Sequence, residues 1–327
     1  MSGVKAGSEH PITVLFNPKA RTGSRVLPRL RSIAAELASE LRWVALEELA
    51  ELREAAGRLI VVGGDGTVNA ACRWLLDHGA TIPLAIVPVG TGNNLARGLR
   101  CPLNPETAFR QALVSHRTRP LDVIRIESEE NTPAQLMVQS AALGFPARIA
   151  ERFERLRKHR AFRFLFRPSG PSVYRLLSVP SLLSQIFSRR DRSLTVRLSL
   201  PKENFEETAL AIFFGNEGSM GGNFLPCPRA QLDDGLLDIC IVRDQRAFRF
   251  LPLFRRVMRG EHLELTEEVV YRQSEGPIEV HLAEPAPLLI DGDLPLICRH
   301  YKLEVLRHRI QCIVSTDAAT GRGLADV

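Results

Sequence analysis

Apolar residues in the first third of the chain alternate between short continuous runs and runs with helical spacing. Continuous apolar runs at Ile12–Phe16, 58–62 and 83–89 predict strands that are covered on both faces. Helical spacing over 28–41 predicts an amphipathic helix, and the same spacing from Val68 onward predicts a second helix, with Thr67 at its N-cap. Strands alternating with helices are typical of a mostly parallel sheet covered on both sides.

Beyond about residue 122 the segments are short and alternate between apolar and polar residues, most clearly over 194–200. A series of such strands predicts an antiparallel sandwich or barrel. The sequence therefore predicts an α/β fold: a doubly wound, mostly parallel domain over 1–123 and a β-rich sandwich domain over 124–310. The active site is expected in the cleft between them, and residues 311–327 are expected to form a flexible tail.

Composition narrows the classes of protein to be considered. With 45% hydrophobic and 24% charged residues, the 327-residue chain has the composition of an ordinary globular protein. Its six cysteines include no CxxC pair, which predicts buried, reduced thiols. Neither a run of roughly 18–20 apolar residues nor the apolar core of a secretory signal is found, so a cytoplasmic location is expected.

The positive charge is concentrated in one segment. Between Arg152 and Arg192 there are eleven Lys or Arg and two acids, giving +9, so the rest of the chain sums to 6 − 9 = −3. This segment predicts peripheral contact with an anionic membrane surface. The alternative is a helical segment that packs its apolar face on the β-rich domain and whose arginines contact only solvent. No recognised motif favours nucleic acid, and the oligomeric state is left open.

Two glycine-rich turns follow predicted strands. In the first, residues 63–67, backbone N–H groups and the start of a helix suit phosphate. Asp65 would repel bare phosphate, a conflict that a nucleotide carrying Mg²⁺ resolves; the alternative is a tight turn with an acid in the first helical turn. The second turn, in "VPVGTGNNLARG", offers asparagines and Arg97. Neither a dinucleotide fingerprint nor a P-loop occurs.

Five motifs in order resemble the diacylglycerol kinase catalytic family, most closely its soluble bacterial lipid kinases, which are related to sphingosine kinases and more distantly to NAD kinases. The motifs are "NPKARTG", "VVGGDGTVNA", "PVGTGNNLARGL", "LDDGLLDI" and "IDGDLP". The resemblance implies an ATP- and Mg²⁺-dependent lipid kinase, which transfers the γ-phosphate of ATP to the hydroxyl of a diacylglycerol-like or sphingoid lipid.

The resemblance also implies roles for particular residues. It assigns nucleotide binding to Asn17, Gly63, Gly64, Asp65, Gly66, Thr67, Asn69, Gly90 and Thr91. It assigns Mg²⁺ binding to Asp234 and the carbonyl of Leu236, substrate or phosphate contacts to Asn94, Arg97 and Asp122, and catalysis to Asp65 and Asp293.

Two positions depart from the family pattern. Asp293 stands where the family has the glutamate that accepts the proton, so the carboxylate is one methylene shorter and its reach falls by roughly a bond length. Asn94 stands where the family commonly has Asp. Two alternatives therefore remain: an NAD kinase-like phosphotransferase, which shares GGDGT, and a catalytically weak nucleotide- or lipid-binding protein.

Overall fold

The computed structural model describes residues 12–37, 39–128, 132–158, 193–221, 224–244 and 247–315. The chain forms two compact units. The first unit takes in the chain up to Asp122, residues Leu232–Asp234 and the chain from Arg307; the second holds Val123–Gln231 and Gly235–Leu306.

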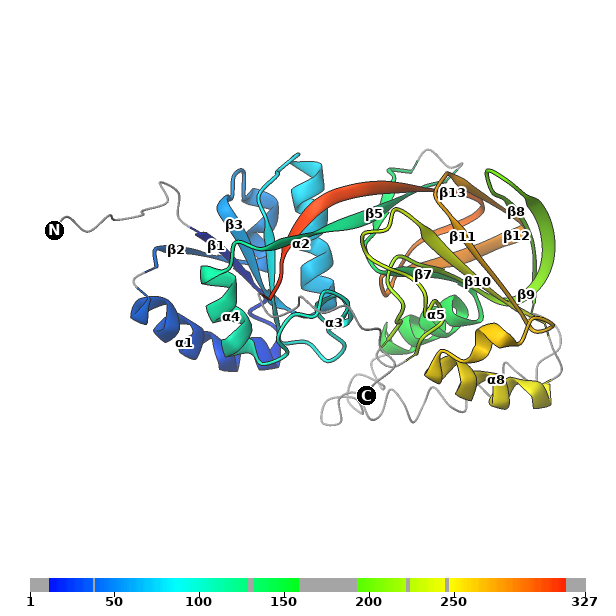
Figure 1. The fold of residues 1–327 in the computed structure, drawn as a ribbon, viewed down its shortest axis with the longest axis horizontal. Coiled ribbons are helices and arrows are strands. Elements are labelled where there is room, and N and C mark those ends of the chain that lie inside the picture. The colour runs from blue at the N-terminus through cyan, green and yellow to red at the C-terminus, as the bar shows by residue number, and fades with distance from the viewer. Residues whose placement is uncertain are drawn as a thin grey trace. The chain divides into compact units, whose positions relative to one another are not determined.

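The first unit is built on a parallel sheet with the strand order β4-β3-β1-β2 (Figure 1). Its strands are β1 (Ile12–Phe16), β2 (Leu41–Ala45), β3 (Ala56–Gly63) and β4 (Leu84–Pro88). Its helices are α1 (Arg21–Glu36), α2 (Asp65–Asp77), α3 (Asn94–Gly98) and α4 (Pro105–Val114), with a 3₁₀ turn η1 (Leu46–Glu51) after β2.

Helices cover both faces of this sheet. Leu30 of α1 and Phe109 of α4 are fully buried against Val14, Ile60 and other strand residues on one face, and α2 packs on β3 with its own buried row. Alternate residues of the same strands therefore face opposite layers of helix, which explains why these strands are continuously apolar. The parallel sheet predicted for this part of the chain is confirmed.

Two predicted helix boundaries are wrong. The helix predicted over 28–41 begins at Arg21 and ends at Glu36, with Pro28 inside it, and Leu41 starts strand β2. Proline marks helix starts in sequence, but burial of the face that carries Leu30 outweighs the hydrogen bond that Pro28 cannot donate. Helix α2 begins at Asp65 with Gly64 at its N-cap, so Thr67 lies within its first turn.

The second unit is a β-rich, antiparallel structure. Strand β9 pairs with β10, β7 and β8, and β12 pairs with β7, β8 and β13. Its strands are β5 (Thr118–Ser128), β6 (Gln135–Met137), β7 (Ser140–Gly144), β8 (Leu194–Ser199), β9 (Asn204–Gly215), β10 (Leu237–Arg243), β11 (Val269–Ser274), β12 (Ile278–Ile290) and β13 (Asp293–Ile313), of which β5 begins and β13 ends in the first unit. Its helical elements are α5 (Phe145–Lys158), α8 (Ala247–Arg259) and the 3₁₀ turn η2 (His262–Glu264).

The alternation seen in the sequence of the second unit matches its burial. Leu194, Val196 and Leu198 of β8 point into a core that also contains Phe214 and Tyr301. The α/β class, with a parallel sheet followed by an antiparallel β-rich domain, is thus confirmed. The six cysteines are free and buried, as expected.

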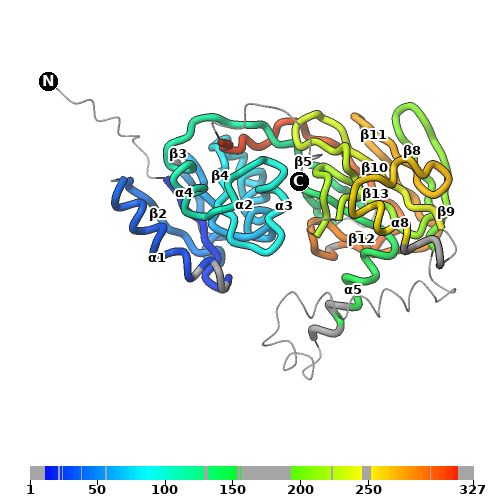
Figure 2. The backbone as a smooth tube through the Cα atoms, turned by 60° about the horizontal axis from the view of Figure 1, so that its bottom comes forward, coloured from blue at the N-terminus to red at the C-terminus, as the bar shows by residue number. Residues whose placement is uncertain are grey.

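The end of β13 differs from the expected tail. Cys312 pairs with Leu84, so the strand runs parallel to β4 at this point, and Figure 2 shows its red end beside β4. Residues 311–313 therefore extend the sheet of the first unit, whereas 316–327 lie outside the described residues. Most of the basic segment, 159–192, also lies outside them. In the part of the chain that is described, no helix combines the length and apolarity needed to span a membrane.

Candidate active site

The two glycine-rich turns lie in backbone contact with each other. They leave neighbouring parallel strands, with Gly63 opposite Pro88, and the amide of Val89 donates to the carbonyl of Gly63 at 3.1 Å. A Cβ atom on Gly90 would lie 2.5 Å from the Cα of Gly64, closer than real Cβ contacts come. Glycine at position 90 is therefore what lets the two turns approach each other this closely.

Asp65 joins the two turns electrostatically. Its carboxylate accepts hydrogen bonds from the backbone amides of Leu95, Asn94 and Asn93, where α3 begins. Burial raises the pKa of Asp65, and these hydrogen bonds act in the opposite direction. A Cβ on Gly92 would lie 2.7 Å from Asp65 Oδ2, so the second turn closes tightly over the carboxylate.

The second turn is also held from within. Asn93 has left-handed backbone geometry, with φ of 53°. Its side chain accepts from the amide of Gly90 at 3.0 Å and donates to the carbonyl of Gly90 at 2.9 Å. Arg97 is exposed and donates to the carbonyl of Gly92 at 3.3 Å. These contacts fix the shape of the turn before any ligand is bound.

Asn17 lies at the same edge of the sheet. It directly follows the last residue of β1, Phe16, and β1 runs parallel to β3. Its Oδ1 accepts from the amide of Lys19 at 2.9 Å. A Cβ on Gly23, near the start of α1, would lie 3.5 Å from the carbonyl of Asn17 and 3.7 Å from Val89. The turn after β1 therefore adjoins the turn after β4. The Lys19 ammonium lies 2.6 Å from the carboxylate of Glu47.

A second acidic group forms around the turn at 232–236, also with residues of the first unit. Asp122 is fully buried, and its Oδ1 accepts from the amide of His308 at 2.6 Å. Arg119 binds both oxygens of Asp233 at 2.6 Å each. Asp234 follows in this turn, which Gly235 continues with φ of 73°.

The triplet Asp291, Gly292 and Asp293 forms the turn between β12 and β13 in the second unit, and its two acids differ in environment. The carboxylate of Asp291 accepts from three successive backbone amides, of residues 138–140, at 2.7–2.9 Å. Asp293 is exposed at the first position of β13. The two carboxylates therefore differ in role: that of Asp291 fixes the backbone of residues 138–140, whereas that of Asp293 is open to solvent.

The structure places the predicted nucleotide residues, with Asn94 and Arg97, at one edge of the sheet. They lie in or next to the turns that follow β1, β3 and β4, including the first residues of α2 and α3: Asn17, Gly63, Gly64, Asp65, Gly66, Thr67, Asn69, Gly90, Thr91, Asn94 and Arg97. Asp122 and Asp234 belong to the second acidic group, whereas Leu236 and Asp293 belong to the other unit.

Two residues of these sites, Asp233 and Asp291, were not predicted. The positive φ of 49° at Asp291, next to Gly292, is a conformation that aspartate adopts more readily than most residues, so the triplet itself was a usable signal. Asp233 precedes the predicted Asp234, and nothing in the neighbouring sequence indicates that it pairs with Arg119.

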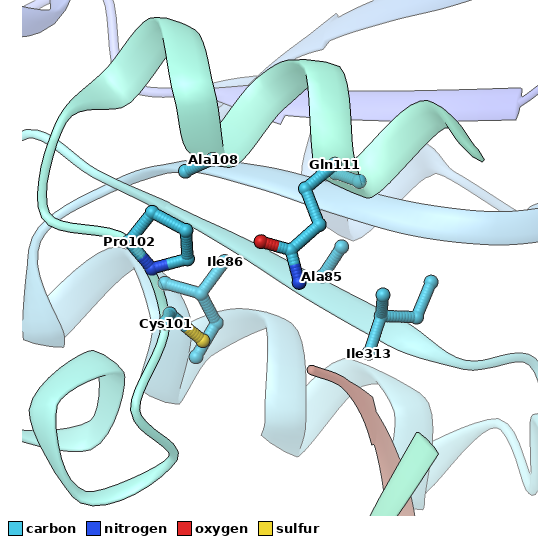
Figure 3. A pocket seen from close by; sticks show the side chains of 8 residues that line it. Ala85, Ile86, Cys101, Pro102, Ala108, Gln111 and Ile313 are labelled. Carbon is cyan, nitrogen blue, oxygen red and sulfur yellow. The ribbon is translucent and has the colours of Figure 1, made fainter. Parts of the chain in front are cut away.

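A small hollow in the first unit is lined by residues of β4, α4, the end of β13 and the segment that follows α3. It is lined by Ala85, Ile86, Cys101, Pro102, Ala108, Gln111, Ala112 and Ile313. Figure 3 shows the amide of Gln111 projecting from α4 among apolar side chains. With one polar lining residue, it offers little that would orient a substrate.

Comparisons with known proteins follow the same division of the chain. The family model described as "Diacylglycerol kinase catalytic domain" matches residues 11–126, and one described as "YegS C-terminal NAD kinase beta sandwich-like domain" matches 179–296. A Mycobacterium tuberculosis H37Rv protein named "Diacylglycerol kinase" is 32% identical over 236 residues, covering 72% of this chain and 70% of its own length. The chain belongs to the diacylglycerol kinase family.

Other similar proteins agree with this family. A Xanthomonas euvesicatoria protein named "Probable lipid kinase YegS-like" is 30% identical over 258 residues, which are 77% of each chain. The crystal structure of a diacylglycerol kinase from Bacillus anthracis strain Sterne covers 94% of this chain and 97% of its own, with a TM-score of 0.67 and 20% identity. That structural likeness shows the fold. By family, the chain is a lipid kinase.

Proposed function

We propose that this chain is an ATP- and Mg²⁺-dependent lipid kinase that phosphorylates the hydroxyl of a diacylglycerol-like or sphingoid lipid. The observation that carries the proposal is the contact between the turns after β3 and β4, with the carboxylate of Asp65 held between them, in a member of this family. Catalysis of phosphoryl transfer requires mainly that the protein position the reacting groups and stabilise the charge of the transferred phosphoryl group. A rigid pair of backbone turns supplies the first of these.

Backbone donors of the first turn are the proposed contacts of the triphosphate. Helix α2 begins directly after Gly64, so the N–H groups of its first turn and the positive end of its dipole lie at the edge where the strands end. The backbone at Gly66 is uncovered, since a Cβ there would meet nothing within 4 Å. The exposed guanidinium of Arg97, fixed to the second turn, is the proposed cation.

The residues of the 232–236 turn fit Mg²⁺. A carboxylate at Asp234 and a backbone carbonyl at Leu236 are the oxygen donors that this ion prefers, with water completing its shell. Neighbouring Asp233 binds Arg119 through both of its carboxylate oxygens, which holds this turn in place. When bound, Mg²⁺ would neutralise negative charge that builds up in phosphoryl transfer.

The two acids assigned to catalysis have different proposed roles. Asp65 positions the second turn against the first, because its carboxylate is already held by the amides at the start of α3. Asp293 is the proposed acceptor of the hydroxyl proton, and its exposure leaves it accessible to a lipid hydroxyl. Asp291 supports Asp293 by fixing the turn that carries it.

The acceptor's chemistry implies contact with a membrane, since a lipid with two acyl chains stays in the bilayer. Peripheral binding to an anionic surface is therefore part of the proposal, with the basic segment at 152–192 as its proposed source. Binding of the full chain to liposomes should rise with the fraction of anionic lipid and fall with added salt. Binding that ignores both would remove this part of the proposal.

The test is transfer of labelled γ-phosphate from ATP to diacylglycerol or sphingosine in mixed micelles. We expect a labelled lipid, and a fall in rate of about 100-fold in Asp65→Asn, because weakening the link between the turns misplaces the phosphate contacts. Asp77→Asn, an exposed aspartate at the end of the same helix, is the matched control and should keep the wild-type rate. Lipids left unlabelled by the wild-type protein would contradict the proposal.

One observation favours a second candidate, phosphorylation of NAD. The family model matched by residues 179–296 is described as NAD kinase β-sandwich-like. The same assay with NAD as acceptor separates the two candidates, since the nucleotide product and the lipid product are extracted into different phases. ATP binding without any labelled product would instead indicate a nucleotide-binding protein of low activity.

A further inference from the structure

Three metal-ligating side chains gather on the outer face of the second unit, on strands β12 and β13. Glu279 and His281 are two residues apart on β12 and share its exposed face, since the residues between and beside them are buried. His300 lies directly opposite His281 on β13. Of the residues that the structure describes, these form the group of three whose ligand atoms all lie within 4.8 Å of one another.

One distance within this group matches that of a coordination shell. His281 Nε2 lies 3.5 Å from Glu279 Oε2. Two ligands at 2.0–2.1 Å from a tetrahedral ion are about 3.4 Å apart, so this pair is already at the required spacing. The rings of His281 and His300 are stacked, with centroids 4.1 Å apart, and must turn about their side-chain bonds to aim both nitrogens at one ion.

We infer that Glu279, His281 and His300 form a binding site for one Zn²⁺ ion or a similar transition-metal ion, which would tie β12 to β13. Two imidazole nitrogens and one carboxylate oxygen suit Zn²⁺, Co²⁺ or Ni²⁺, whereas Mg²⁺ prefers a shell of oxygens. Three protein ligands leave one tetrahedral position for water. The inference uses none of the residues assigned to phosphoryl transfer.

Two positively charged residues near the group affect how tightly it binds a metal ion. Arg197, opposite His281 on β8, is paired with Glu206 at 3.4 Å, so its charge is partly balanced. Lys302 lies opposite Glu279 on β13, where its positive charge disfavours a metal ion on the same face. Replacing Lys302 by Gln should therefore tighten metal binding.

The cysteines are not competing ligands in the folded chain. All six are buried, and burial raises the pKa of the Cys101 thiol to about 12, which disfavours the thiolate that binds zinc. Binding through cysteine would also be visible, because Co²⁺ bound to thiolate has a strong near-ultraviolet charge-transfer absorption.

The experiment is titration of the chelator-treated full chain with ZnCl₂ in excess MgCl₂, followed by calorimetry and by metal analysis after dialysis. We expect about one Zn²⁺ per chain, and affinity reduced by at least about tenfold in His281→Ala and in His300→Ala. His116→Ala, an exposed histidine of the first unit, is the matched control and should bind as the wild type does.

Co²⁺ substitution gives a second readout, with visible bands of a tetrahedral site that His281→Ala removes. No bound Zn²⁺, equal affinity in the two histidine variants and the wild type, or a thiolate absorption would each overturn the inference. A chain that binds zinc in this way without phosphorylating a lipid would leave it intact, so its failure and that of the proposed kinase activity are distinguishable.

Discussion

Replacement of Gly90 by Ala tests whether the two turns work as one unit. The added Cβ would lie 2.5 Å from the Cα of Gly64 and 2.9 Å from Asn93 Oδ1. Carbon atoms in contact lie at about 3.5–4.0 Å, so the turns must part by about 1 Å. The nearer of these two atoms, the Cα of Gly64, belongs to the backbone rather than to the end of a flexible side chain, and overpacking of this kind costs about 1–3 kcal/mol.

The loss should be visible in both stability and nucleotide binding. A cost of about 1–3 kcal/mol lowers Tm by about 2–4 °C per kcal/mol in a domain of this size. If ATP binds both turns at once, part of its binding free energy is used to bring the turns back into contact. A cost of about 1–3 kcal/mol would weaken ATP binding by about 5–150-fold. Thermal unfolding of the free protein and calorimetry with MgATP measure the two effects separately.

Gly66→Ala is the matched control for stability. It adds the same methyl group in the same pair of turns, where it meets nothing within 4 Å, and alanine favours the helix by about 0.4–1 kcal/mol. Its Tm should therefore not fall. Wild-type Tm in Gly90→Ala would refute the tight contact, and a lower Tm with wild-type ATP affinity would refute the shared role in nucleotide binding.

Three further predictions concern the acids. Burial raises the pKa of Asp65 above its ordinary 3.8, so the folded state binds this proton more tightly than the unfolded state does. The stability of the wild-type protein relative to Asp65→Asn should therefore decline as pH rises above 3.8. Measurement of Tm against pH for both proteins checks this prediction, and parallel curves would contradict it. Asp291→Asn should lower the free energy of unfolding by about 1–3 kcal/mol, because three amides lose a charged acceptor, whereas Asp293→Asn should change it by less than about 0.5 kcal/mol. Asp293→Asn should instead lower kcat by about 10²–10⁴-fold with the lipid acceptor, and equal denaturant midpoints or an unchanged kcat would reverse these assignments. Asp293→Glu should raise kcat if reach limits the present carboxylate; an unchanged or lower kcat would show that the active site is fitted to aspartate.

Local pattern was enough to predict the parallel sheet and both glycine turns. Runs such as Ile12–Phe16 are apolar because helices cover both faces, and the glycines mark where β3 and β4 end. Strand β2 was missed because only one of its five residues, Val44, is buried, so its apolar pattern is weak. The start of α1 was misplaced because Pro28 resembles a first helical residue, while the packing that overrides it is tertiary.

The site could be predicted only where its residues are close in sequence. Gly64 and Gly90 each lie in a recognisable turn, although their contact follows from strand pairing rather than from either motif. Asp291 binds amides about 150 positions earlier, and Arg119 binds Asp233, 114 positions later. No local pattern specifies such partners, because the register of distant strands brings them together.

The measurement that tests the central claim most directly is hydrogen–deuterium exchange of the backbone amides with and without MgATP. The account predicts slower exchange in both turns, over residues 63–67 and 90–95, and little change in peptides from β8 or β11. Protection confined to one turn, or found only outside both, would contradict the claim that the two turns bind the triphosphate together.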